Sequence, residues 1–190
     1  MKRDKVILIL VASYILLVPV MFILPVYSTP EYSIISNTLS QLGAQNTPNA
    51  WIMNFTFVSL GISSIIAGWR YYEGFAFQRL FLILFGISLT LAAFLNHAPV
   101  NTLAQYNISE DGWHSYFIFN AVLTFVILTV SSTFILEKQT DRLMTTAAGV
   151  SVIFLSILTS EVAHAAGVWQ RLFFIISFGW MIYSFKSRDI

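Results

Sequence analysis

Long apolar stretches alternate with short polar ones along the whole chain. A membrane-spanning helix needs about 20 predominantly apolar residues to cross the hydrocarbon core of a bilayer. Six stretches approach or exceed this length, at residues 6–27, 51–69, 77–96, 115–136, 143–163 and 168–185. The pattern predicts an all-α polytopic membrane protein, with six transmembrane helices in one bundle and residues 1–190 as a single domain.

The first apolar stretch also has features of a secretory signal peptide, because charged residues precede it. However, its run from Val6 to Tyr27 is longer than the apolar core of a signal peptide, and it lacks an obvious small-x-small cleavage site. We therefore expect this stretch to be retained as the first transmembrane helix.

Composition supports a membrane protein and limits its chemistry. The chain is 57% hydrophobic and 10% charged, with a mean hydropathy of +0.75, so it has too little polar surface for a soluble globular domain. It contains no cysteine, which excludes disulfides, thiolate metal sites and cysteine nucleophiles. Any metal would need histidine, carboxylate, carbonyl or water ligands.

The basic residues predict an orientation in the membrane. Short cytoplasmic loops are enriched in Lys and Arg. Nine of the ten basic residues fall on one predicted side, namely Lys2, Arg3, Lys5, Arg70, Arg79, Lys138, Arg142, Lys186 and Arg188. This distribution predicts cytoplasmic N- and C-termini. The loops near residues 28–50 and 97–114, and the turn before residue 168, would then lie outside.

The first outer loop carries a helical pattern of polar and apolar residues. Ser33, Ser36 and Ser40 recur at helical spacing. An opposing apolar stripe consists of Ile35, Leu39 and Leu42, and Gly43 is a suitable stop. We expect a short amphipathic helix here, lying on the outer end of the bundle or dipping into it.

All three histidines fall near outer membrane boundaries. His114 follows Asp111 by three residues, and His164 follows Glu161 by three, so each pair would share one face of a helix. With His97 as a third imidazole, this set predicts a four-coordinate zinc site with water in an open position. Alternatively, the histidines hydrogen-bond head groups or backbone carbonyls, and Asp111 caps the helix that starts near His114.

Arg171 is the one basic residue on the predicted outer side. Its guanidinium would either neutralise Glu161 or bind a phosphate or carboxylate group of a ligand. Gln170 and Trp169 would line the same pocket, and Asn54 lies close enough to the predicted outer end to join it. Residues 78–81 and 170–173 share the letters Gln-Arg-Leu-Phe on opposite sides of the membrane, a weak inverted repeat of the kind found in some transporters.

Four short motifs resemble a known family. They are Ser36-x-x-x-Ser40-Gln-Leu-Gly43, Trp51-x-Met53-Asn54, a histidine-bearing loop that ends at His114, and Gly167-Val-Trp-Gln-Arg171. Together they resemble domain-of-unknown-function family 998, small membrane proteins of bacteria and archaea. The resemblance implies six helices and a prokaryotic cytoplasmic membrane, without an established activity. The segment Ala98-Pro-Val-Asn101 departs from an acidic stretch usual in that family, so no acid directly follows His97.

Three functions fit these residues. In the first, a zinc-dependent hydrolase cleaves a lipid or other amphiphile, as do the loosely similar alkaline ceramidases, whose helix count and histidine spacing differ. In this hydrolase, zinc would be bound by His97, His114 and His164, and Glu161 or Asp111 would act as a ligand or general base. Ser36 or Ser40 would polarise the substrate carbonyl. Arg171 would hold an anionic head group. The second is a non-enzymatic transporter or receptor, and the third a single-haem or quinone protein. We expect membrane lipids and an amphiphilic or anionic small molecule as partners, and no nucleic acid.

Overall fold

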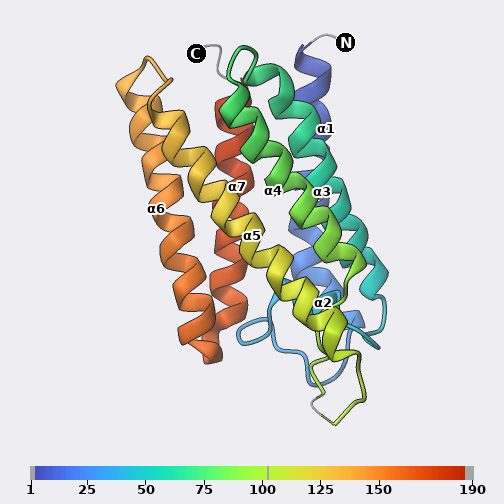
Figure 1. Cartoon of the computed structure of the whole chain (residues 1–190). Helices are drawn as coiled ribbons and strands as arrows, with labels where there is room; N and C mark the ends of the chain where they lie inside the picture. The colour runs from blue at the N-terminus through green and yellow to red at the C-terminus, as the bar shows by residue number, and fades with distance from the viewer. Residues whose placement is uncertain (1–2, 102, 187–190) are drawn as a thin grey trace.

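The computed structural model describes residues 3–101 and 103–186, and this part of the chain is entirely helices and connecting loops (Figure 1). Lys2 and Arg188, which entered the charge count, lie outside the described residues. The elements are α1 (Arg3–Ile23), η1 (Leu24–Tyr27), α2 (Leu39–Leu42), α3 (Ala50–Tyr71), α4 (Ala76–Phe94), α5 (Ile108–Thr133), α6 (Gln139–Glu161), η2 (Ala163–Ala165) and α7 (Ala166–Lys186).

Six helical segments are long and apolar enough to cross a membrane, which confirms the predicted number of spans. They are Val6–Tyr27, Ala50–Tyr71, Ala76–Phe94, Ile108–Thr133, Gln139–Glu161 and Ala163–Lys186. Only helices and closed barrels satisfy all backbone polar groups inside hydrocarbon, so a bundle of such helices is the expected form of a multi-pass membrane protein.

The start of α5 differs from the prediction. The helix begins at Ile108 rather than near residue 115, about two turns earlier. Asn107 is its N-cap, and the Asn107 side chain accepts hydrogen bonds from the backbone N–H groups of Ser109 and Glu110. The alternative role of Asp111 as the helix cap was therefore wrong, because Asp111 lies inside the first turn of the helix.

The amphipathic helix predicted in the first loop is much shorter than its pattern suggested. Only Leu39–Leu42 is α-helical; it begins after a capping box formed by Thr38 and Gln41 and ends, as predicted, at Gly43. Leu39 and Leu42 are fully buried, but Ile35 is exposed, so it does not extend their apolar stripe. The preceding segment forms turns because its carbonyl groups bond to α7, as described below.

The helices form a ring in which each packs on its sequence neighbours, and α7 closes the ring against α1 and also contacts α3. The start of α1 and the end of α7 lie at one end of the bundle (Figure 1). The opposite end carries the loops 28–49 and 95–107 and the turn between α6 and α7, and we name it the loop end. Figure 1 shows α5 and α6 diverging from each other toward the loop end.

A chain of aromatic rings fills the centre of the bundle. Phe174 of α7 stacks on Phe57 of α3 at 5.3 Å and on Phe178 at 5.9 Å, measured between ring centroids. Phe85 of α4 contacts Phe178 at 6.0 Å and Phe125 of α5 at 5.7 Å. Offset and tilted rings of this kind pack favourably. Phe85 and Phe174 of this chain of rings also line the cavity described below.

Candidate functional site

A cavity of about 540 Å³ lies among α4, α5, α6 and α7 and is covered by the two long loops. This volume is typical of small-molecule binding sites. Its polar lining residues are Thr38, Ser40, His97, His114, Ser115, Ser156, Thr159, Ser160 and Gln170. Its apolar lining residues are Phe85, Leu89, Ile118, Phe119, Ala121, Val122, Ile157, Phe173 and Phe174.

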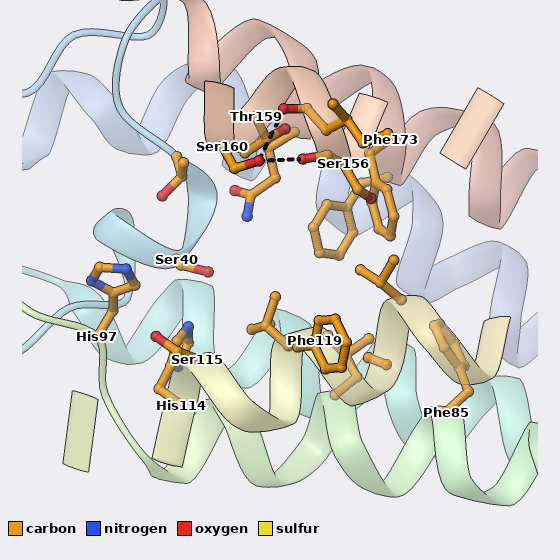
Figure 2. Close-up of a pocket in the computed structure, with 18 residues that line it drawn as sticks. Ser40, Phe85, His97, His114, Ser115, Phe119, Ser156, Thr159, Ser160 and Phe173 are labelled. Atoms are coloured by element: carbon orange, nitrogen blue, oxygen red, sulfur yellow. Dashed lines mark hydrogen bonds between the residues drawn. The ribbon is translucent and has the colours of Figure 1, made fainter. Parts of the chain in front are cut away.

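One end of the cavity is polar, whereas the rest of its lining combines apolar side chains with the hydroxyls of α6, and Figure 2 draws Ser156 and Thr159 beside Phe173. Figure 2 shows Ser40, His97, His114 and Ser115 at one end, and Phe85 and Phe173 toward the other. The cavity also reaches the lateral surface of the bundle. Phe119 of α5 is 66% exposed and Ile157 of α6 is 54% exposed, and both line the cavity. It therefore opens sideways between the two diverging helices.

His114 is the most buried ionisable residue of the cavity, with 3% of its surface exposed. Its Nδ1 lies 2.8 Å from the carbonyl oxygen of Ala92 and 2.7 Å from that of Leu95. Carbonyl oxygens only accept hydrogen bonds, so Nδ1 carries the hydrogen. In the neutral imidazole Nε2 is then an acceptor, and this atom is buried without a partner.

His97 lies beside His114, and their rings meet edge to face with centroids 5.2 Å apart. Its Nδ1 is 3.0 Å from the carbonyl oxygen of Ala98 and 3.3 Å from Oδ1 of Asp111. Asp111 also accepts a 2.7 Å hydrogen bond from the backbone N–H of Ala98. The carboxylate thus orients both the imidazole and the loop that carries it.

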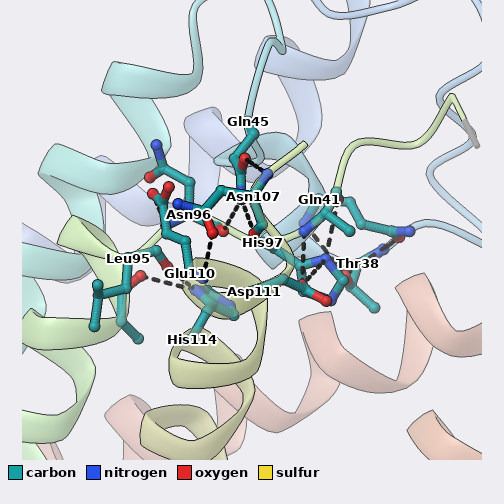
Figure 3. Close-up of polar contacts among 12 residues, drawn as sticks. Thr38, Gln41, Gln45, Leu95, Asn96, His97, Asn107, Glu110, Asp111 and His114 are labelled. Carbon is teal, nitrogen blue, oxygen red and sulfur yellow. Dashed lines mark hydrogen bonds and ion pairs between the residues drawn. The ribbon is translucent and has the colours of Figure 1, made fainter. Parts of the chain in front are cut away.

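The loop 95–107 is held by polar side chains from two directions (Figure 3). Glu110 accepts a 2.8 Å hydrogen bond from the backbone N–H of Asn96. Gln45 donates through Nε2 to the carbonyls of Asn96 and Asn107, and accepts from the Asn107 N–H. These contacts fix the position of His97 relative to His114.

The segment around α2 forms the second cover of the cavity. Gln170 of α7 accepts a 2.5 Å hydrogen bond from the backbone N–H of Leu39, which attaches α2 to α7. This contact places Thr38 and Ser40 on the cavity wall. Ser40 is 3% exposed, so the cover is closely packed.

Arg171 is buried, with 3% of its surface exposed, and it binds backbone rather than a carboxylate. Its Nε donates to the carbonyl of Met21, and its Nη1 donates to the carbonyls of Ile34, Asn37 and Gly167 at 2.8–3.1 Å. Its Nη2 donates to the hydroxyl of Tyr32 at 2.9 Å. The guanidinium thus joins the end of α1, the first loop and α7.

Tyr32 completes this attachment as a neutral phenol. Its hydroxyl lies within hydrogen-bond distance of the carbonyls of Asn37 and Thr38, to which it donates. Burial raises the pKa of Tyr32, and this effect exceeds the opposing attraction of the Arg171 charge. The positive charge is therefore stabilised by hydrogen-bond acceptors and not by a tyrosinate.

Gly167 allows the first loop to approach α7 closely. A Cβ atom at this position would lie 2.3 Å from the carbonyl oxygen of Asn37 and 2.4 Å from that of Ile34. The backbone N–H of Val168 donates to the carbonyl of Ile35 in the same contact. The motif Gly167-Val-Trp-Gln-Arg171 therefore forms the binding surface for the first loop.

One family comparison covers nearly the whole chain. Residues 10–185 match the family described as "Protein of unknown function (DUF998)". The chain belongs to this family. The match confirms the resemblance carried by the four motifs. No curated protein and no solved structure matches the chain.

In this DUF998 protein the predicted site residues separate into two groups. His97, His114, Ser40 and Gln170 line the cavity, and Asp111 bonds to His97. The residues outside its lining are Ser36, Asn54, Glu161, His164, Trp169 and Arg171.

The residues outside the lining have other contacts or none. Asn54 donates to Gly43 and Asn96, so it supports the two covering loops. Glu161 and His164 are exposed at the turn between α6 and α7, and Arg171 does not pair with Glu161. Among the described residues no group of three or more His, Asp or Glu side chains is arranged to hold a metal ion.

The lining of the DUF998 cavity also includes polar residues that were not predicted as site residues. Ser156, Thr159 and Ser160 lie on one face of α6, and Ser115 extends the polar end on α5. The spacing of three and four residues in α6 was a usable signal. Hydroxyl residues in transmembrane helices often serve helix packing instead, and the sequence does not show that α5 and α6 separate at this depth.

Proposed function

We propose that this protein binds an amphiphile from the bilayer, with the head group at the histidine end of the cavity and part of the apolar chain among the phenylalanines. One observation carries the proposal: the cavity is polar at the histidine end, mostly apolar toward Phe85 and Phe173, and open between α5 and α6. A ligand that enters sideways keeps its chain in an apolar environment throughout.

The apolar part of the cavity contributes little to selectivity between amphiphiles. A ligand's chain leaves lipid tails that are as apolar as the cavity residues it then contacts, so it gains little free energy on entering. Selection of one amphiphile therefore depends on hydrogen bonds at the polar end. Those groups lie beneath two loops that are fixed by Asp111, Glu110, Gln170 and Arg171.

The charge distribution supports a location for this site. We propose a prokaryotic cytoplasmic membrane with the loop end on the outer side, because nine of ten basic residues fall on the opposite predicted side. The ligand would then come from the outer leaflet.

Paired variants on one helix test amphiphile binding. Ser156 lines the cavity and its hydroxyl bonds only to its own helix, whereas Ser151 of the same helix does not line it. We expect Ser156→Phe to reduce co-purified and added lipid at least tenfold in native mass spectrometry, and Ser151→Phe to leave it unchanged. Equal lipid occupancy in both variants, or none in the parent protein, would reject the proposal.

A zinc-dependent hydrolase is the second candidate, and one feature favours it. Metal-binding histidines usually donate their other ring N–H to a carboxylate or carbonyl. His97 and His114 both hold Nδ1 in this way, which leaves their Nε2 atoms for a metal. Ser40 would then polarise the substrate carbonyl. The transporter or receptor role and the haem or quinone role stay predictions.

Metal analysis tests this candidate independently of lipid binding. Zinc measured in the purified protein should be stoichiometric and should fall when His97 and His114 are both replaced by Asn. Absence of bound zinc in protein purified without chelator would eliminate the hydrolase.

A further inference from the structure

Nε2 of His114, at the polar end of the cavity, is a hydrogen-bond acceptor in a fixed position. Nδ1 of His114 is held as a donor by the carbonyls of Ala92 and Leu95, so Nε2 of the neutral ring can only accept. Nε2 is buried and has no partner, although buried polar atoms are nearly always paired. Since His114 lines the cavity, a bound ligand is the natural source of the missing donor.

Gln170 of α7 supplies a donor elsewhere in the lining of the cavity. The backbone N–H of Leu39 can only donate, so the side-chain atom 2.5 Å from it is the amide oxygen. The assignment of oxygen and nitrogen in Gln170 is therefore fixed by its partner. The amide nitrogen remains as a donor in a side chain that lines the cavity.

Among the residues that the structure describes, no Lys, Arg, Asp or Glu side chain lines the cavity. Arg171, which follows Gln170, directs its donors to backbone carbonyls and to Tyr32. Asp111 is occupied by His97 and by the backbone of Ala98. A charged head group would therefore lose its hydration without gaining a counter-charge, which is strongly unfavourable.

We infer that the ligand is an uncharged amphiphile with a free hydroxyl head group, which donates a hydrogen bond to Nε2 of His114. A hydroxyl supplies the donor that Nε2 lacks and carries no charge, and it can also accept from a donor in the lining, such as the Gln170 amide. This class includes long-chain alcohols and acylglycerols, and it excludes phosphate and carboxylate lipids. The inference rests on the proposed amphiphile binding and adds the chemistry of the head group.

Three probes with one chain separate the inference from the proposed function. Oleyl alcohol, oleyl methyl ether and oleate are each added to the full chain in detergent and compared by native mass spectrometry. We expect the alcohol to bind at least tenfold more tightly than the other two, because the ether cannot donate and the carboxylate is charged. Equal binding of all three, or tighter binding of oleate, overturns the inference and leaves amphiphile binding intact. Binding of none rejects both.

Two matched variants test the role of His114 itself. Asn offers an amide N–H near the position of Nδ1 and no equivalent of Nε2, so His114→Asn retains a donor for the two carbonyls. We expect His114→Asn to reduce the preference for alcohol over ether to less than threefold at an unchanged melting temperature. His164→Asn, at an exposed histidine outside the cavity lining, should keep the preference. The reverse pattern would overturn the assignment to His114, and the ligand series decides the head-group class even if a variant fails to fold.

Discussion

Replacing Arg171 by Met should release the first loop from α7. The substitution keeps an apolar side chain of similar length but removes every guanidinium donor. The hydroxyl of Tyr32 then loses its shared partner, as do the carbonyl groups of Met21, Ile34, Asn37 and Gly167. Leu39 would still be attached through Gln170.

The size of the effect follows from these contacts. A buried acceptor left without a partner costs about 1–3 kcal/mol. Four carbonyls lose a donor, but that of Asn37 keeps the Tyr32 hydroxyl. Water can reach the part-buried carbonyls once the loop loosens, and removing a buried charge offsets part of the loss. We expect the free energy of loop opening to fall by about 3 kcal/mol, which is roughly a 100-fold change in the opening equilibrium.

A single introduced thiol measures this opening. The chain contains no cysteine, so Ser40→Cys provides one reactive group at a position that is 3% exposed. Labelling of a buried thiol requires local opening. The maleimide labelling rate should therefore rise roughly 100-fold when Arg171→Met is added. An exposed thiol from Ser160→Cys should label equally in both backgrounds.

Arg79→Met is the matched control, because Arg79 donates one hydrogen bond to the Trp69 carbonyl and stacks over the Trp69 ring at the other end of the bundle. It should leave labelling at Ser40→Cys within threefold. If Arg171→Met also stays within threefold, the guanidinium does not hold the loop. If Arg171→Met abolishes lipid binding without faster labelling, Arg171 contacts the ligand. That result would support its predicted role in binding an anionic group of the ligand.

Further predictions concern the loop contact, the third histidine and the orientation. Gly167→Ala should lower the melting temperature by roughly 5 °C, because its Cβ would meet two carbonyl oxygens, whereas Gly112→Ala has open space and should not lower it. His164→Ala should leave zinc content and lipid occupancy unchanged, since the exposed ring does not line the cavity. A loss of zinc in this variant would instead support a zinc site formed by all three histidines. Reporter fusions after residue 190 should be active only in the cytoplasm, and periplasmic activity would contradict the charge-based orientation.

The six spans were predictable because they depend on a local property of the chain. Transfer of about 20 apolar residues into a bilayer depends on composition and length, and helix formation satisfies the backbone within each segment. The helix stop at Gly43 was likewise readable from a local pattern. The start of α5 was missed because His114, Asp111 and Glu110 look like a loop sequence, although Asn107 caps a helix ahead of them.

The candidate site was only partly predictable. The sequence indicated that His97 and His114 share one predicted side with Gln170 and Ser40, and the fold places all four on one cavity. It could not separate His164 from them, because its spacing to Glu161 is the same as that of His114 to Asp111. The two histidines differ in their place in the fold: His114 lies in α5 against the cavity, whereas His164 lies at the exposed turn between α6 and α7.

By itself, the amino-acid sequence determined the membrane class, the six helices and the side of the bundle where polar chemistry gathers. Tertiary structure alone decided that Arg171 binds carbonyls more than 130 positions away, at Ile34 and Asn37, and that α5 and α6 separate to leave a cavity. The physical reason is the sequence separation over which each kind of interaction acts. Hydropathy and helix periodicity act over a few turns, whereas hydrogen bonds that fold a loop over a bundle join residues whose separation no local pattern records.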